Sequence, residues 1–229
     1  MVESTLTEMA ERQFDTLDRV ILGNMGAPVV IQARNGPLAY WCNKGYEPGE
    51  DPNQDAQVIH TLSNWFACID GISGGRHGDI AAEIVGQQLQ KAFTLRQGGL
   101  DDDSLDYRRE WFQLHVHERA KKHLQRLAPS GACYLAFGIT ERVLEVAHAG
   151  DVKLVLFNPD GDIIFETKDH LNSSGDPYNA IFTYVQRFPD IDLVPIQRNY
   201  RILAGSDGLF GTLSTLQIGA LTKHQPMPT

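Results

Sequence analysis

The chain has 229 residues, of which 42% are hydrophobic and 21% charged, a composition typical of a soluble globular protein with enough apolar side chains for a core. Its formal net charge of −9 argues against a nucleic-acid partner, which would require a basic face. No apolar run approaches the ~20 residues needed to cross a bilayer, and the N-terminal residues lack the pattern of a secretory signal. We therefore expect no membrane partner. Because the three cysteines form no CxxC pair, we also expect reduced thiols and a cytoplasmic or nuclear location.

The first half of the chain predicts one short helix, two pairs of strands and two longer helices. In chain order we expect a helix over 5–22, strands over 28–33 and 37–42, a loop over 43–53, strands over 56–61 and 64–69, a helix over 79–95, and a helix that ends near 127 after a cap at Asp102, Asp103 or Ser104. Apolar side chains at helical spacing predict the buried faces of the two long helices. They are Ile80, Ile84, Val85, Leu89 and Phe93 in the first helix, and Leu105, Trp111, Leu114, Ala120, Leu124 and Leu127 in the second.

The second half of the chain is dominated by strands. We expect strands over 132–139, 142–148, 152–157, 162–166 and 200–205, an irregular segment over 167–199, and a short helix beginning near Leu213. Strands, two consecutive helices and then further strands predict an α+β layered fold. No repeat or composition shift marks a boundary, so residues 1–229 are treated as a single domain.

Two apolar runs each end in Asp-Gly, at Asp70-Gly71 and at Asp207-Gly208. A strand that ends in Asp holds its carboxylate rigidly, and the following glycine leaves its own carbonyl approachable. Two such ends side by side would direct hard oxygen ligands at one point, which predicts a Mg²⁺ or Mn²⁺ site. Asp-Gly is also a common turn dipeptide, but its presence after both runs favours the site. Asp55, just before a predicted strand, is a third candidate ligand.

The glycine-rich segment 71–78 supports a competing interpretation, because it lies between a predicted strand and a predicted helix. Such a loop can bind a nucleotide phosphate through backbone N–H groups and the helix N-terminus. The segment matches neither G-x-G-x-x-G nor a Walker Lys-Ser/Thr pattern, so nucleotide binding is kept only as an alternative.

Five segments carry a joint pattern. They are Lys44-Gly45 through Asn53-Gln54-Asp55; Phe66 to Gly74 with Ile80-Ala81-Ala82-Glu83; Ser130-Gly131-Ala132 with Leu144 to Lys153; Thr167-Lys168-Asp169-His170; and Leu203 to Phe210. In the same order they resemble the motifs of the metal-dependent protein phosphatases (the PPM, or protein phosphatase 2C, family). The resemblance covers residues from about 40 to 215.

This resemblance implies a fold, a reaction and a site. The fold would be α+β, with two antiparallel β-sheets in a sandwich flanked by helices. Two Mg²⁺ or Mn²⁺ ions would be held by Asp55, Asp70, Asp207 and the carbonyl of Gly71, and the three aspartates would be the catalytic residues. Metal-activated water would hydrolyse phosphoserine or phosphothreonine in a phosphoprotein partner, with Lys44 contacting the substrate phosphate.

The sequence also departs from the family pattern. The family usually ends with a strand preceded by Asp-Asn, whose Asp is a further metal ligand, whereas no acidic residue follows Asp207 here. We therefore expect that strand and that ligand to be missing. Ile72 stands where many members have a histidine, and Gln54 replaces the glutamate of some members. These changes support an alternative function, a catalytically inactive pseudophosphatase that acts as a binding or scaffold subunit.

Overall fold

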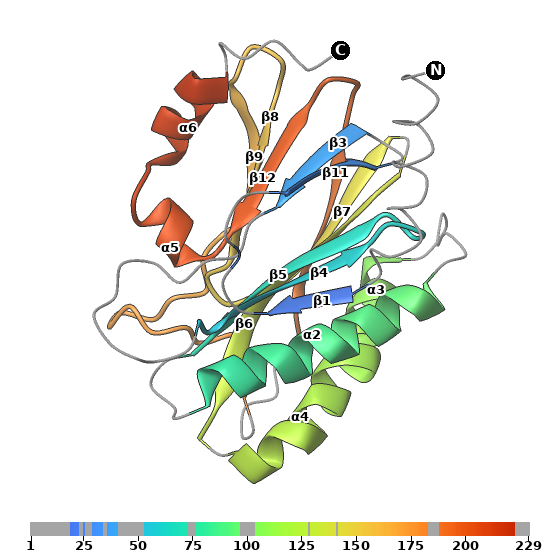
Figure 1. The fold of residues 1–229 in the computed structure, drawn as a ribbon, viewed down its shortest axis with the longest axis vertical. Coiled ribbons are helices and arrows are strands. Elements are labelled where there is room, and N and C mark those ends of the chain that lie inside the picture. The colour runs from blue at the N-terminus through green and yellow to red at the C-terminus, as the bar shows by residue number, and fades with distance from the viewer. Residues whose placement is uncertain are drawn as a thin grey trace.

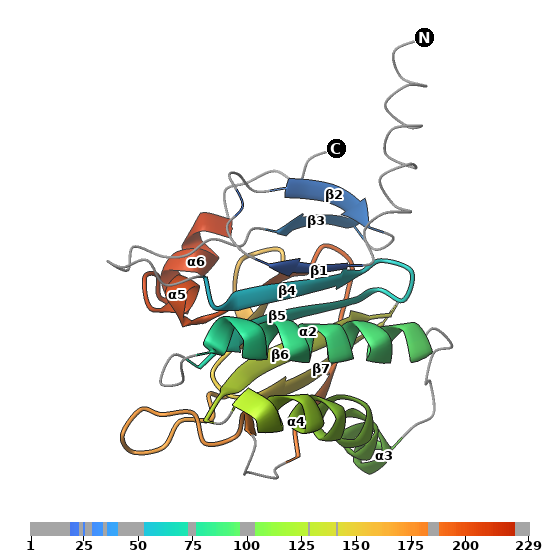
Figure 2. The same cartoon turned by 60° about the horizontal axis from the view of Figure 1, so that its bottom comes forward.

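The computed structural model describes residues 19–22, 25, 29–33, 36–40, 53–72, 77–96, 104–127, 129–140, 142–182 and 188–222. These residues form an α+β fold in which a large and a small antiparallel sheet face each other, with helices on the outside (Figures 1 and 2). Among the described helices, none is long and apolar enough to pass through a lipid bilayer.

The large sheet has seven strands and provides the framework of the site. Its order is β1 (Arg19–Leu22), β4 (Asp55–His60), β5 (Trp65–Gly71), β6 (Gly131–Ile139), β7 (Val143–Ala149) and β11 (Asp190–Pro195), and the two-residue β10 (Ile181–Phe182) also pairs with β6. Neighbouring strands are antiparallel throughout. β6 is the most buried strand of the sheet, because helices cover one of its faces and the interior of the sandwich covers the other. Both faces of β6 accordingly carry apolar side chains.

The small sheet has the order β12 (Arg201–Gly205), β8 (Lys153–Phe157) and β9 (Ile163–Glu166). A separate hairpin pairs β2 (Val29–Ala33) with β3 (Gly36–Tyr40). Side chains of this hairpin and of the small sheet pack with the inner face of the large sheet in one hydrophobic cluster, which includes Phe66, Leu135, Leu154 and Leu156. This cluster is the interior of the sandwich.

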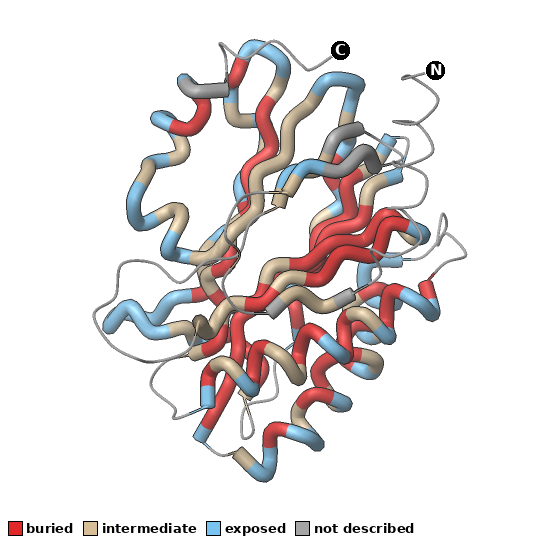
Figure 3. Tube along the Cα trace, viewed as in Figure 1, coloured by how far each residue is buried: buried red, intermediate tan, exposed pale blue. Residues whose placement is uncertain are grey.

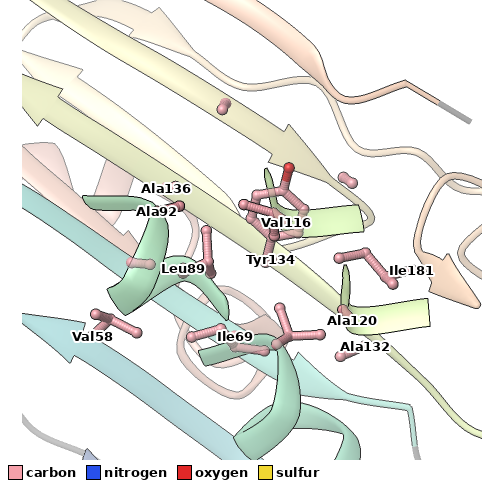
Figure 4. Close-up of a cluster of buried hydrophobic side chains, with 14 of the residues drawn as sticks. Val58, Ile69, Leu89, Ala92, Val116, Ala120, Ala132, Tyr134, Ala136 and Ile181 are labelled. Carbon is pink, nitrogen blue, oxygen red and sulfur yellow. The ribbon is translucent and has the colours of Figure 1, made fainter. Parts of the chain in front are cut away.

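Helices cover the outer face of each sheet. The large sheet carries α2 (Gly78–Leu95), α3 (Leu105–Phe112), a π-helical turn (Gln113–His117), α4 (Glu118–Leu124) and a 3₁₀ turn (Gln125–Leu127). Figure 4 shows side chains of these helices, among them Leu89 and Val116, packed on Ile69 and Tyr134 of the sheet. The small sheet packs against α5 (Asp207–Phe210) and α6 (Thr215–Thr222) through Val155, Phe157 and Ile218. Figure 3 shows the resulting buried interior.

Most of the expected elements are confirmed, and the exceptions have physical reasons. Residues 19–22 form a strand rather than the end of a helix, because they pair with β4; residues 5–18 lie outside the described part. The segment 167–199 is not irregular throughout, since β11 pairs with β7 over six residues. Ser104 caps α3 by accepting a hydrogen bond from the N–H of Tyr107 at 3.2 Å.

The predicted buried faces of the helices are partly wrong. Ile80, Leu105 and Leu114 are exposed, by 37%, 45% and 60% respectively. Leu114 lies in the π-helical turn, which places one more residue in the turn and so rotates the following side chains. Phe112 and Val116, which lie four residues apart on one face, reach the core instead.

Candidate metal centre

Two of the predicted acidic residues lie opposite each other on adjacent strands. β4 begins at Asp55 and β5 ends with Asp70 and Gly71, and Asp55 and Asp70 are directly paired in the antiparallel ladder. Cα atoms so paired are ~4.5–5.5 Å apart, so their carboxylates share one face at one end of the sheet.

The third acidic residue comes from the other sheet. β12 ends at Gly205, and Asp207 is the first residue of the short helix α5, so it does not lie directly at a strand end as expected. The hydroxyl of Ser206 donates a hydrogen bond to Oδ2 of Asp55 at 2.9 Å, which joins the small sheet to the large one at this point. The two Asp-Gly segments thus converge at the same end of the sandwich.

The pKa of Asp70 shows how close these charges are. It is raised from the usual 3.8 to about 8. Burial is the largest cause, and repulsion from three nearby carboxylates adds to it: Asp55, Asp207 and Asp151. Burial also raises the pKa of Asp55, although the hydrogen bond from Ser206 opposes this shift. We call Asp55, Asp70, Asp151 and Asp207 the acid cluster.

Asp151 is a fourth acidic residue at this site, and the sequence did not point to it as a ligand. It follows Gly150 directly after β7, and its Oδ1 atom is buried without a hydrogen-bond partner among the described residues. The signal that could have found it is the position of Gly150-Asp151 at the end of a buried strand, within the segment that resembles a phosphatase motif. A buried carboxylate oxygen without a donor is suited to a cation.

Gly71 lies where the chain approaches itself too closely for a side chain. A Cβ atom at this position would be 2.1 Å from the carbonyl oxygen of Gly78. A Cβ atom on Gly78 would in turn be 3.1 Å from the carbonyl oxygen of Gly71. The two glycines therefore allow these two backbone segments to lie in close contact, beside Gln54.

The other residues predicted for the site are less informative. Lys44 and residues 73–76 of the glycine-rich segment lie outside the described part of the chain. His77 is exposed and precedes α2, and its side chain accepts no capping hydrogen bond from the first N–H groups of that helix. Ile72 packs against the interior of the sandwich, and its N–H donates to the carbonyl of Gly131 at 3.0 Å.

The donor set fits a hard divalent cation. Carboxylates and a backbone carbonyl are the ligands that Mg²⁺ and Mn²⁺ prefer. A cation would relieve the repulsion that raises the pKa of Asp70 and would supply a partner for the buried oxygen of Asp151. The described residues therefore contain a set of oxygen atoms suited to such a cation.

Comparison with known proteins identifies the family of the chain. A family model described as protein phosphatase 2C matches residues 53–176, which is more than half of the chain. The chain belongs to the protein phosphatase 2C family. No curated protein matches the chain.

Solved structures show the same fold at low sequence identity. A bacterial serine phosphatase has a TM-score of 0.67 at 16% identity, covering 87% of this chain and 85% of that one. Stp1 from Staphylococcus aureus, a serine/threonine phosphatase, has a TM-score of 0.65 at 17% identity, with coverages of 90% and 85%. The catalytic domain of the serine/threonine protein phosphatase PstP, in complex with two manganese ions, has a TM-score of 0.63 at 18% identity, with coverages of 91% and 85%.

Proposed function

We propose that this chain is a Mg²⁺- or Mn²⁺-dependent phosphatase that hydrolyses phosphoserine and phosphothreonine in a phosphoprotein. The observation that carries this proposal is the convergence of Asp55, Asp70 and Asp207 from two sheets at one end of the sandwich. Membership of the protein phosphatase 2C family and the manganese ions of PstP support the choice of reaction and metal.

The metal would be held by Asp55, Asp70, Asp207 and the carbonyl of Gly71. When bound, such a cation supplies Lewis acidity, which lowers the pKa of water and polarises a phosphoryl oxygen. Lys44 is the proposed contact of the substrate phosphate, on the basis of the family resemblance.

Two of the protein's own residues affect how this site would bind a metal ion. Ser206 fixes the orientation of Asp55 by donating to one of its carboxylate oxygens. Asp70 retains a proton near neutral pH in the metal-free protein, because its pKa is raised to about 8. Metal binding must displace that proton, so metal affinity should increase as the pH rises towards 8.

The proposal is tested by hydrolysis of a phosphoserine peptide in the presence of Mn²⁺. We expect turnover by the wild-type protein and a loss of at least about 100-fold in Asp70→Asn, since even residues that only support metal ligands contribute 10–100-fold. Asp106→Asn is the matched control, because Asp106 is exposed and lies in α3, outside the acid cluster. Wild-type activity no higher than that of Asp70→Asn would reject the phosphatase function.

The alternative is a pseudophosphatase that uses the same fold to bind a partner. It is favoured by two positions in the sequence: Gln54 stands where some family members have a glutamate, and Ile72 stands where many have a histidine. Here we expect no turnover in any divalent metal and an unfolding temperature that Mn²⁺ leaves unchanged. Full activity on the phosphopeptide would exclude this alternative.

A further inference from the structure

We infer that His170 is a positioning residue for the acid cluster: it holds the Gly150–Asp151 turn and thereby places the Asp151 carboxylate beside Asp70. This inference rests on the proposed function in that the cluster is taken to bind a divalent cation. His170 itself lies outside the cluster, in the segment between β9 and β10.

Two hydrogen bonds attach His170 to Gly150. The N–H of Gly150 donates to Nδ1 of the His170 ring at 3.2 Å, and the N–H of His170 donates to the carbonyl oxygen of Gly150 at 3.0 Å. His170 and Gly150 are both buried, so water cannot readily replace these bonds. The backbone on both sides of the Gly150 α-carbon is therefore held by one residue.

The conformation of Gly150 makes this attachment necessary. Its φ of +103° lies in a region that residues with side chains rarely adopt, and a Cβ atom there would be 2.3 Å from Sγ of Cys133. Glycine permits this turn but does not specify it, since glycine has many other accessible conformations. The two hydrogen bonds between Gly150 and His170 select the conformation that leads the chain into Asp151.

The position of Asp151 depends on this turn, which sets the direction of its side chain, and on the thiol of Cys133, which forms a hydrogen bond with its carboxylate. Its Oδ1 atom is buried and accepts no hydrogen bond in the described structure, yet its charge contributes to the raised pKa of Asp70. The backbone turn that His170 holds and the neighbouring thiol of Cys133 therefore place this carboxylate together.

The tautomer of His170 is determined by its surroundings. Because Nδ1 accepts the hydrogen bond from Gly150, the neutral ring carries its proton on Nε2 and donates it to Oδ2 of Asp190 at 3.0 Å. Asp190 lies on β11, so this bond fixes the ring to the edge of the large sheet. A chain of hydrogen bonds thus runs from β11 through His170 to the turn that carries Asp151.

The same tautomer excludes a second metal site nearby. Possible ligand atoms of His148, His170 and Asp190 lie within 4.8 Å of one another. A metal on Nε2 of His170 would need the proton on Nδ1, where it would face the N–H of Gly150. Metal-binding histidines instead donate their second N–H to an acceptor, so this group of residues is better explained as support for the turn.

The decisive measurement is the affinity for Mn²⁺, determined from the electron paramagnetic resonance signal of the free ion. His170→Ala should weaken binding by about 10–100-fold, the usual effect of losing a residue that supports a ligand. His170→Asn should restore much of the affinity, because its side-chain oxygen can accept the Gly150 N–H. In an Asp151→Asn background, His170→Ala should cause little further loss, since both changes remove one coupled contribution.

His148→Ala is the matched control. His148 is equally buried and its ring stacks on His170 with centroids 4.7 Å apart, but the hydrogen bond from the N–H of Gly150 goes to the ring of His170 instead. We expect it to destabilise the fold without changing Mn²⁺ affinity. Equal weakening by His148→Ala and His170→Ala, or additive effects of His170→Ala and Asp151→Asn, would overturn the inference.

Amide hydrogen exchange separates this inference from the proposed function. In the metal-free protein, the Gly150 N–H should exchange faster in His170→Ala than in the wild type, and the increase should be larger than any caused by His148→Ala. Wild-type protein that binds no Mn²⁺ would reject the proposed function, and the exchange rate of Gly150 would still decide whether His170 holds the turn. An unchanged exchange rate in His170→Ala would reject the positioning role in either case.

Discussion

At the scale of single residues, the acid cluster is a set of charges that the fold brings together at a cost to its own stability. Asp70 lies opposite Asp55 in the sheet, and Asp207 and Asp151 add to the repulsion. Such repulsion without a cation is typical of sites organised for binding rather than for stability.

The raised pKa of Asp70 predicts how the stability of the metal-free protein depends on pH. Between pH 3.8 and about 8 the folded protein keeps a proton that the unfolded chain has lost, so stability falls as the pH rises. From pH 6.5 to 8 we expect a loss of about 1–2 kcal/mol in the free energy of unfolding, because each pH unit contributes at most about 1.4 kcal/mol. His148 has a small opposite effect near pH 6.5: its folded-state pKa is lowered to about 4, whereas the unfolded chain still carries its proton in about half of the molecules at that pH, so its contribution to stability rises slightly with pH.

Urea unfolding at the two pH values, with a chelator present, measures this loss. Asp70→Asn cannot titrate and should lose the part of the pH dependence that Asp70 causes. An equal slope in the wild type and Asp70→Asn would contradict the assignment to Asp70.

At the scale of elements, a buried group of charges fixes the helices on the large sheet. Glu145 of β7 forms ion pairs with Arg96 at the end of α2 and Arg108 of α3, and all three side chains are buried. The guanidinium of Arg96 also lies over the rings of Trp65 and Trp111, at 4.8 and 4.7 Å from their centroids. These contacts join two consecutive helices to strands of the large sheet.

Glu145→Gln should therefore destabilise the protein strongly. It leaves two buried guanidinium groups without a compensating charge, and removing one partner of a buried ion pair costs about 3–5 kcal/mol. The control is Asp106→Asn, which breaks the exposed pair with Arg109 and should cost less than about 1 kcal/mol. Chemical denaturation of both variants checks this, and similar losses in the two would show that the buried pairs contribute little.

At the scale of the whole molecule, the two sheets meet at the acid cluster. Ser206, which lies between β12 of the small sheet and Asp207, donates a hydrogen bond to Asp55 of the large sheet. The hydrophobic interior of the sandwich lies between the same two sheets. A cation bound by residues of both sheets would bridge them, so metal binding and global stability should be coupled.

Mn²⁺ should accordingly raise the unfolding temperature of the wild-type protein. At a concentration 100 times Kd, binding contributes about 2.7 kcal/mol, which corresponds to roughly 5–10 °C for a domain of this size. Thermal unfolding of the wild type and Asp70→Asn, with sodium chloride at equal ionic strength as the control, measures the effect. The same increase in both proteins would show that the ion acts elsewhere.

The sequence by itself determined the elements whose signals are local. Apolar runs predicted β5 to β8, helical spacing predicted α2, and two Asp-Gly pairs with Asp55 indicated a metal site, because burial and turn geometry leave a trace in neighbouring residues. Only the tertiary structure decided what depends on distant partners. β11 is recognisable through its pairing with β7, Leu114 is exposed because of a π-helical turn, and Asp151 joins the cluster because His170 holds the turn before it. β11 and the placement of Asp151 depend on contacts between segments that are far apart in the chain, and the local sequence carries only a weak trace of the second, in the position of Gly150-Asp151 at a strand end.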